Sequence, residues 1–164
     1  MTKHKGLTVL SLLATIVAAA PVLAAQGTPV VLWGQFTTAT PKAEAKVFMN
    51  SLPKRQMAVI PGCPAPFGYR SGKGGLVTIS FMGSQAPAAC FPKLRQKFEA
   101  ELGEPEQATA SFGSMIGLGN GDLDTTSEGL MLVWREGEKK TKLIRTPYGG
   151  FNLIITVRED KYLY

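Results

Sequence analysis

The sequence predicts an α+β fold in which two helices cover one face of an antiparallel sheet. Residues 76–82 alternate apolar and polar side chains, which is typical of a strand with one buried face. The last third of the chain holds three further runs of this kind, which predict a C-terminal three-stranded meander. Two other segments, near 41–52 and 92–102, repeat apolar residues at helical spacing instead.

The first 24 residues have the composition of a secretory signal peptide. Two lysines precede an apolar run, and small residues lead to an expected cleavage site after Ala24 or Ala25. The apolar run is shorter than the roughly 20 residues that a membrane-spanning helix needs. We therefore expect residues 25–164 to form a single α+β domain in the periplasm or outside the cell, with no integral membrane segment after cleavage.

Composition narrows the chemistry that the mature chain can perform. The only histidine, His4, is lost with the leader, so the mature chain has no imidazole for a catalytic triad or for zinc. The formal net charge of +6 falls to +4 when Lys3 and Lys5 are removed, which favours weak attraction to polyanions. We expect no cofactor, no metal site and no catalytic residue.

Cys63 and Cys90 are the only cysteines, and an even pair in an exported chain predicts a disulfide. In the chain-entropy model, closing a loop of this length stabilises the fold by about 3.5 kcal/mol. A redox-active pair is the alternative interpretation. Such pairs usually lie two residues apart at the start of a helix, whereas these cysteines are 27 apart in the sequence.

The first half of the mature chain predicts a strand, a helix and a second strand. Residues 28–36 favour a strand that Gly34 ends or bulges, and residues 56–60 favour another. Pro41 and Pro53 frame the helix between these strands. The side chains expected to share its buried face are Ala45, Phe48, Met49 and Leu52.

Residues 61–75 are predicted to form an exposed loop, because they include three prolines and five glycines. The loop is not a phosphate-binding P-loop. Only three residues, Tyr69 to Ser71, separate Gly68 from the Gly-Lys pair where a P-loop has four, and Gly74 follows Lys73 where serine or threonine is needed. We interpret it as a basic hairpin loop.

Several features of residues 92–102 agree in predicting the second helix. Pro92 lies in its first turn, Gly103 and Pro105 follow its last turn, and an apolar stripe occupies one face. Charged pairs four residues apart mark the solvated face. The stripe consists of Leu94, Phe98 and Leu102.

The remainder predicts strands joined by polar turns. Residues 108–118 favour a strand, and residues 119–129 a polar loop. Asn120, Asp122 and Asp124 alternate as in a calcium-binding loop, but Thr125 and Met131 replace the required glycine and glutamate, so a solvated turn is expected. The meander strands are expected at residues 130–135, 141–146 and 151–157.

The order of these elements, with the segments WG, LGEP and LVTISF, resembles small exported α+β proteins of the outer-membrane assembly lipoprotein and β-lactamase inhibitor folds. The resemblance implies helices packed on one face of an antiparallel sheet. It transfers no functional residue to this chain.

The function expected from these observations is an exported, non-enzymatic binding or structural module for an unknown protein or envelope component. Nucleic acid is not an expected partner outside the cytoplasm. Loops are the usual place for recognition, so Tyr69, Arg70 and Lys73 are the first candidate contacts and Tyr148 is the second.

Two alternatives belong to other functional classes. One is a protein that binds an envelope polyanion through basic side chains of the final sheet, namely Arg135, Lys139, Lys140, Lys142, Arg145 and Arg158. The other is a hydrolase that uses two carboxylates. Its candidates are Glu99, Glu101, Glu104, Glu106, Asp122 and Asp124.

Overall fold

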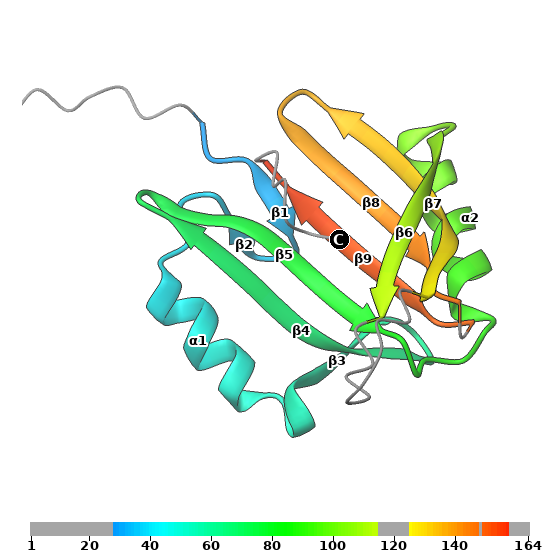
Figure 1. Cartoon of the computed structure of the whole chain (residues 1–164). Coiled ribbons are helices and arrows are strands. Elements are labelled where there is room, and N and C mark those ends of the chain that lie inside the picture. The colour runs from blue at the N-terminus through cyan, green and yellow to red at the C-terminus, as the bar shows by residue number, and fades with distance from the viewer. Residues whose placement is uncertain (1–27, 115–124, 148, 158–164) are drawn as a thin grey trace, which may run out of the picture.

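A computed structural model of the chain describes residues 28–114, 125–147 and 149–157. A seven-stranded antiparallel sheet forms its body, and two helices lie on one face of that sheet (Figure 1). A separate two-stranded sheet consists of β1 (Val31–Trp33) and β2 (Phe36–Thr37). In these described parts, neither helix has the length and apolar character needed to cross a membrane.

The main sheet has the order β3-β4-β5-β9-β8-β7-β6, and every neighbouring pair is antiparallel. Two meanders, β3 to β5 and β6 to β9, therefore meet where β5 pairs with β9. The strands are β3 (Gln56–Ile60), β4 (Cys63–Gly72), β5 (Gly75–Gly83), β6 (Glu106–Ser114), β7 (Thr125–Glu136), β8 (Lys139–Arg145) and β9 (Phe151–Thr156). The helices are α1 (Lys42–Ser51), the short 3-10 helix η1 (Pro53–Arg55) and α2 (Cys90–Leu102).

The predicted α+β class, the two helices and the C-terminal meander are confirmed. Each helix buries the stripe expected of it. Ala45 of α1 is fully buried, and the other three residues of its stripe pack on the core. Leu94 and Phe98 of α2 are buried as well, and the ring of Phe98 lies between Trp33 and Trp134.

The predicted disulfide is confirmed: Cys63 is bonded to Cys90, with their Cα atoms 5.6 Å apart. Cys63 begins β4 and Cys90 begins α2. Both side chains are about 1% exposed. The bond therefore attaches the start of α2 to the sheet from inside the core.

The prediction of an exposed loop at residues 61–75 is wrong, because ten of these residues form β4. Its first half pairs only with β3, and its pairing with β5 begins at Phe67. Pro64 and Pro66 lie in that first half, where one side of β4 has no partner strand among the described residues. Proline lacks an amide donor and is tolerated in a strand at such positions.

Two other predicted boundaries also need correction. Gly34, with a φ of 53°, ends the first strand as predicted, because β1 stops at Trp33, but Phe36 then begins β2 of the same hairpin, so residues 28–36 are not one strand. The predicted polar loop at 119–129 is wrong over its last five residues, which begin β7. Its acidic candidates Asp122 and Asp124, together with Asn120, lie outside the described residues.

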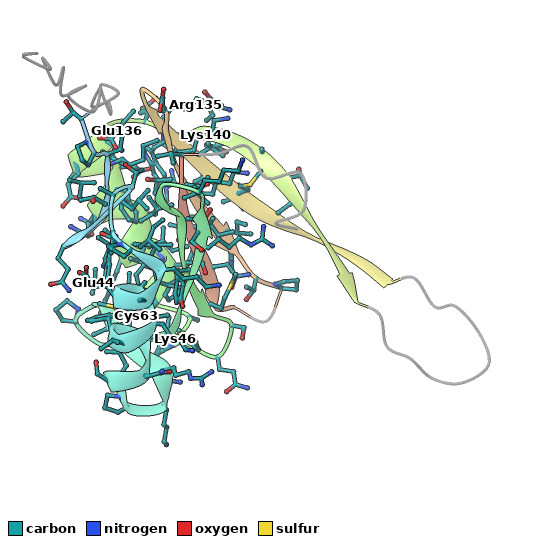
Figure 2. All side chains as sticks on the ribbon, turned by 90° about the vertical axis from the view of Figure 1, so that its left-hand side faces the viewer. Glu44, Lys46, Cys63, Arg135, Glu136 and Lys140 are labelled. Atoms are coloured by element: carbon teal, nitrogen blue, oxygen red, sulfur yellow. A yellow bond between two sulfur atoms is a disulfide. The ribbon has the colours of Figure 1, made fainter. Side chains whose placement is uncertain are left out.

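The two faces of the main sheet differ. The face toward the helices carries the main apolar core, which includes Phe67, Phe81 and Leu153. The opposite face carries a smaller buried apolar cluster beside polar and basic side chains. This cluster consists of Ala110, Met131, Val133, Ile144 and Ile154. Figure 2 shows β6 and β7 extending away from the helices on the side of this opposite face.

Candidate binding face

A row of residues crosses the sheet on the face away from the helices. The strand register pairs its members one after another, from β4 through β5, β9 and β8 to β7. Side chains at directly paired positions of an antiparallel sheet lie on the same face. We call it the cationic row; it consists of Arg70, Thr78, Thr156, Lys140 and Arg135.

The middle of the row is buried and hydrogen-bonded. Thr78 and Thr156 are each about 1% exposed, and their Oγ1 atoms lie 3.0 Å apart. Thr156 Oγ1 also donates to the carbonyl oxygen of Val77 at 3.1 Å. These contacts hold β5 and β9 together, so the basic side chains on either side project from a rigid sheet.

Basic side chains occupy both ends of the row. Arg70 and Arg135 are exposed, and Lys140 is half-buried. Lys142 lies two residues beyond Lys140 on β8 and shares its face. Neighbouring strands are about 4.8 Å apart, so the three strand steps from Arg70 to Lys140 span about 14 Å.

One carboxylate shares this face with the four cations, within the described part of the chain. Glu106 of β6 pairs with Val133, and Arg135 Nε donates to its two oxygens at 3.0 and 3.2 Å. Both side chains are about half exposed or more, so this ion pair contributes little stability. Among the described residues, this face therefore holds four basic side chains and one carboxylate.

The structure separates the residues that sequence reasoning grouped in one loop. Tyr69 is half-buried, packs on the helix-side core and has its ring 6.4 Å from that of Phe67. Arg70 follows it on the strand and belongs to the opposite face. Lys73 is exposed in the turn between β4 and β5. Tyr148 lies outside the described residues.

The basic residues predicted on the final sheet also lie on both of its faces. Arg135, Lys140 and Lys142 share the cationic face, whereas Lys139 and Arg145 occupy alternate positions of β8. Lys139 instead pairs with Glu136 at 2.7 Å across the turn. Figure 2 labels Arg135 and Lys140 near each other at one end of the sheet. Arg158 lies outside the described residues.

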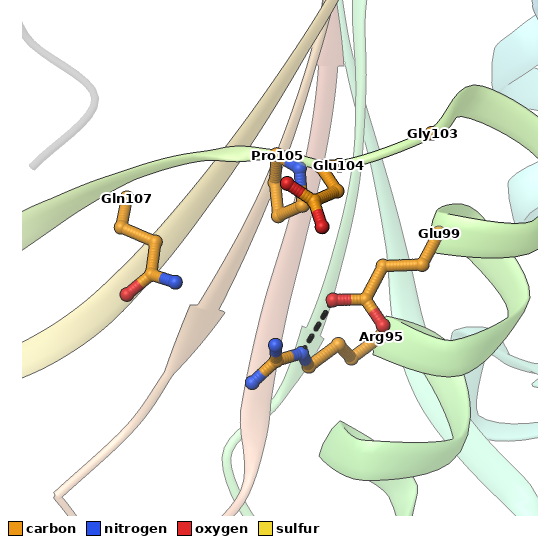
Figure 3. A pocket seen from close by; sticks show the side chains of 6 residues that line it. All are labelled: Arg95, Glu99, Gly103, Glu104, Pro105 and Gln107. Atoms are coloured by element: carbon orange, nitrogen blue, oxygen red, sulfur yellow. Dashed lines mark hydrogen bonds and ion pairs between the residues drawn. The ribbon is translucent and has the colours of Figure 1, made fainter.

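A polar depression of about 440 Å³ lies where α2 ends and β6 begins. Figure 3 shows Arg95 and Glu99 on α2 facing the segment that leads into β6. Arg95 Nε donates to Glu99 Oε1 at 2.7 Å. The residues that line the depression are Arg95, Glu99, Gly103, Glu104, Pro105 and Gln107.

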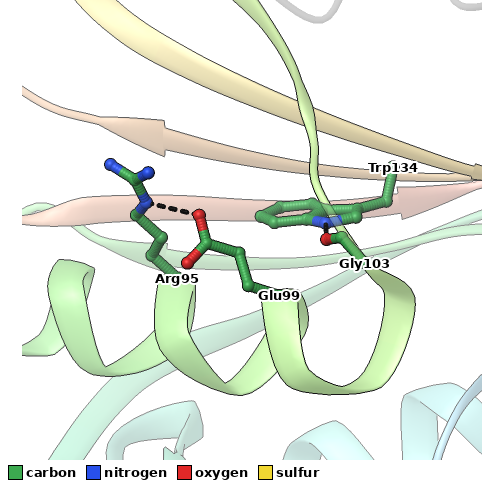
Figure 4. Close-up of polar contacts among 4 residues, drawn as sticks. All are labelled: Arg95, Glu99, Gly103 and Trp134. Carbon is green, nitrogen blue, oxygen red and sulfur yellow. Dashed lines mark hydrogen bonds and ion pairs between the residues drawn. The ribbon is translucent and has the colours of Figure 1, made fainter.

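The wall of this depression is held by a buried tryptophan. Trp134 is 3% exposed, and its Nε1 donates to the carbonyl oxygen of Gly103 at 2.8 Å (Figure 4). Gly103 caps α2 with a positive φ of 82°. The hydrogen bond therefore fixes the exit of α2 against β7.

Three of the four glutamates predicted as hydrolase candidates around this helix end form ion pairs with arginine or lysine side chains. Glu99 pairs with Arg95, Glu101 with Lys97, and Glu106 with Arg135. Glu104 is exposed. Across the described residues, no group of three or more histidine, cysteine or acidic side chains is placed to hold a metal ion.

Comparison of the chain with protein-family models, with curated proteins and with solved structures found no match. Assignment of function consequently depends on the residues of this chain. A local signal that could have identified part of the row is the alternation of polar and apolar residues at Thr78, Ile79 and Ser80. No local signal places Arg70 in line with them.

Proposed function

We propose that this protein is an exported, non-enzymatic binding module that holds an anionic partner on the sheet face away from its helices. The observation that supports the proposal is the convergence of Arg70, Lys140, Lys142 and Arg135 on one face, although Arg70 is distant in sequence from the other three. A cluster of one charge sign attracts opposite charge and speeds encounter.

The chemistry of the partner follows from the arrangement. The cations lie along a row that crosses five adjacent strands and do not surround a single point, so an extended anionic chain fits them better than one small anion. In an exported protein, such a chain is an anionic envelope polymer, or an acidic segment of another protein. The hydrogen-bonded threonines between the cations keep this line rigid.

Binding to heparin, used as a model polyanion, tests the proposal by titration calorimetry at several salt concentrations. We expect wild-type protein to bind, and to bind more weakly as salt rises, because salt screens exposed charges. The Lys140→Gln and Lys142→Gln double variant should bind more weakly than wild type at low salt.

The matched control removes the same charge from another surface. Lys42 and Lys46 are exposed on α1, so the Lys42→Gln and Lys46→Gln double variant changes net charge equally without touching the proposed face. Equal weakening in the two double variants would show that only net charge matters and would reject the proposed face. Thermal melting of both variants verifies that each is folded.

Export is tested separately. N-terminal sequencing of the protein recovered from envelope or culture fractions should find a mature chain that begins at Ala25 or Gln26. Recovery of protein that retains Met1 would contradict the exported part of the proposal without bearing on the anionic partner.

A further inference from the structure

The two edge strands of the main sheet differ in how they are protected. β3 has five residues, and its pairing with β4 shifts register between Ala58 and Ile60. Lys54 and Arg55 precede it with positive φ values of 51° and 55°, and Pro61 follows it. Short length, a bulge, flanking charge and proline are the features that keep an edge strand from pairing with another chain.

β6 has a charge and a proline only at its start, where Glu104 and Pro105 precede it, and it has neither the short length nor the bulge of β3. It pairs with β7 in unbroken register over nine residues, from Glu106 opposite Val133 to Ser114 opposite Thr125. It contains no proline, and its only charged residue is Glu106 at its first position. Among the described strands, β7 is its only neighbour in the sheet. Its outer edge therefore presents backbone donors and acceptors suited to another strand.

Ala110 is buried in the smaller apolar cluster, but the far half of β6 pairs with no described strand other than β7. β8 pairs with β7 only as far as Met131 opposite Ile144. Beyond that point, residues 109–114 of β6 and 125–130 of β7 form a two-stranded ribbon that Figure 2 shows leaving the body of the protein. A two-stranded ribbon alone is marginally stable in water, so a third strand would stabilise this one.

We propose that the outer edge of β6 pairs with β6 of a second copy of this chain, antiparallel and about a two-fold axis near Ala110. The charge pattern of the strand supports this occupant and this direction. Antiparallel pairing places each Glu106 opposite Ser114 of the other copy, at opposite ends of the interface. Parallel pairing would align the two carboxylates directly, which is destabilising.

The geometry of such a pair has a consequence for the cationic row. A two-fold axis that relates antiparallel neighbours stands perpendicular to the sheet, so both copies keep the same face on the same side. The two rows would then lie on one continuous sheet, with each Arg135 one strand away from the joined edge. The pairing itself does not depend on the proposed function.

The interface is small compared with that of a permanent dimer, so the dimer should form as concentration rises. Sedimentation velocity of wild-type protein over a wide concentration range should show a monomer that converts to a dimer. Hydrogen exchange at low and high concentration gives a second measurement. The amides of β6 should become more protected in the dimer, whereas those of β3 should not change.

A charge exchange at Thr109 tests the register. Thr109 is exposed, and in the proposed pairing the two copies of this residue lie diagonally about 7 Å apart. Thr109→Lys alone and Thr109→Glu alone should each weaken the dimer several-fold through repulsion, and an equimolar mixture of the two variants should restore it. The control is Ala58→Lys, at an exposed position of β3, which should dimerise as wild type does.

The proposal is overturned if wild-type protein sediments as a monomer at every concentration. It is equally overturned if Thr109→Lys dimerises like wild type, or if the mixture of charged variants stays monomeric. Heparin binding by a monomeric Thr109→Lys variant would leave the proposed function intact, so the two proposals can fail separately.

Discussion

The hydroxyl groups of Thr78 and Thr156 lie 3.0 Å apart in the buried centre of the sheet. Because Thr156 Oγ1 donates its proton to the carbonyl oxygen of Val77, Thr78 is the donor between the two threonines. Thr78 belongs to β5 and Thr156 to β9, the strands where the two meanders meet. This contact therefore links the two halves of the fold.

Replacement of Thr156 by valine should lower the free energy of unfolding by about 1–3 kcal/mol, because the buried Thr78 hydroxyl loses its acceptor. The Thr78→Val and Thr156→Val double variant should lose less stability than the sum of the two single variants, since it leaves no buried hydroxyl without an acceptor. Urea denaturation of the four proteins in this cycle measures the difference. Strictly additive losses would show that the two hydroxyls are not coupled.

Removal of the disulfide by Cys63→Ala and Cys90→Ala should lower the free energy of unfolding by about 3.5 kcal/mol. Without the cross-link, the unfolded chain has more conformational entropy than the unfolded wild-type chain. Reductant should lower the melting temperature of wild-type protein and leave that of the double variant unchanged. Alkylation of native wild-type protein without reductant should label neither cysteine. Two labelled thiols would rule the bond out.

Phe98 lies between two tryptophan rings, with centroids 6.4 Å from Trp33 and 5.5 Å from Trp134. Phe98→Ala should therefore cost about 3–5 kcal/mol of stability, as expected when a buried aromatic side chain is deleted. Gln96→Ala, an exposed position of the same helix, is the control and should change stability by less than about 0.5 kcal/mol. A similarly small loss for Phe98→Ala would contradict the packing of α2.

Gly75 has a φ of 139°, and a Cβ atom at this position would overlap the backbone carbonyl oxygen of Thr38. Gly75→Ala should therefore destabilise the fold by about 1–3 kcal/mol through backbone strain alone, and by more if the contact with Thr38 cannot relax. Gly74→Ala is the matched control, because a Cβ atom there meets nothing within 4 Å. Equal melting temperatures for the two variants would contradict the close approach of Thr38 to this turn.

The loop predicted at residues 61–75 shows where local reasoning fails. Its prolines and glycines favoured a loop in the prediction, although Cys63, Ala65 and Phe67 alternate with other residues as in a strand. In the structure these three side chains are buried. A proline excludes a strand only where its missing amide is needed by a neighbour. Whether a neighbour is present depends on the lengths of β3 and β5 and on their register with β4, which composition does not contain.

By itself, the sequence determined the features that depend on near neighbours along the chain. The stripes of α1 and α2 and the alternation of β5, β8 and β9 follow from helical and strand periodicity, which a short window contains. The pairing of Cys63 with Cys90 followed from there being no other cysteine. The tertiary structure alone decided that β5 lies beside β9, and so that Arg70 lies in line with Thr156 and Lys140. Pairing between strands distant in sequence is set by which apolar faces are buried together across the whole core, and no local pattern records that choice.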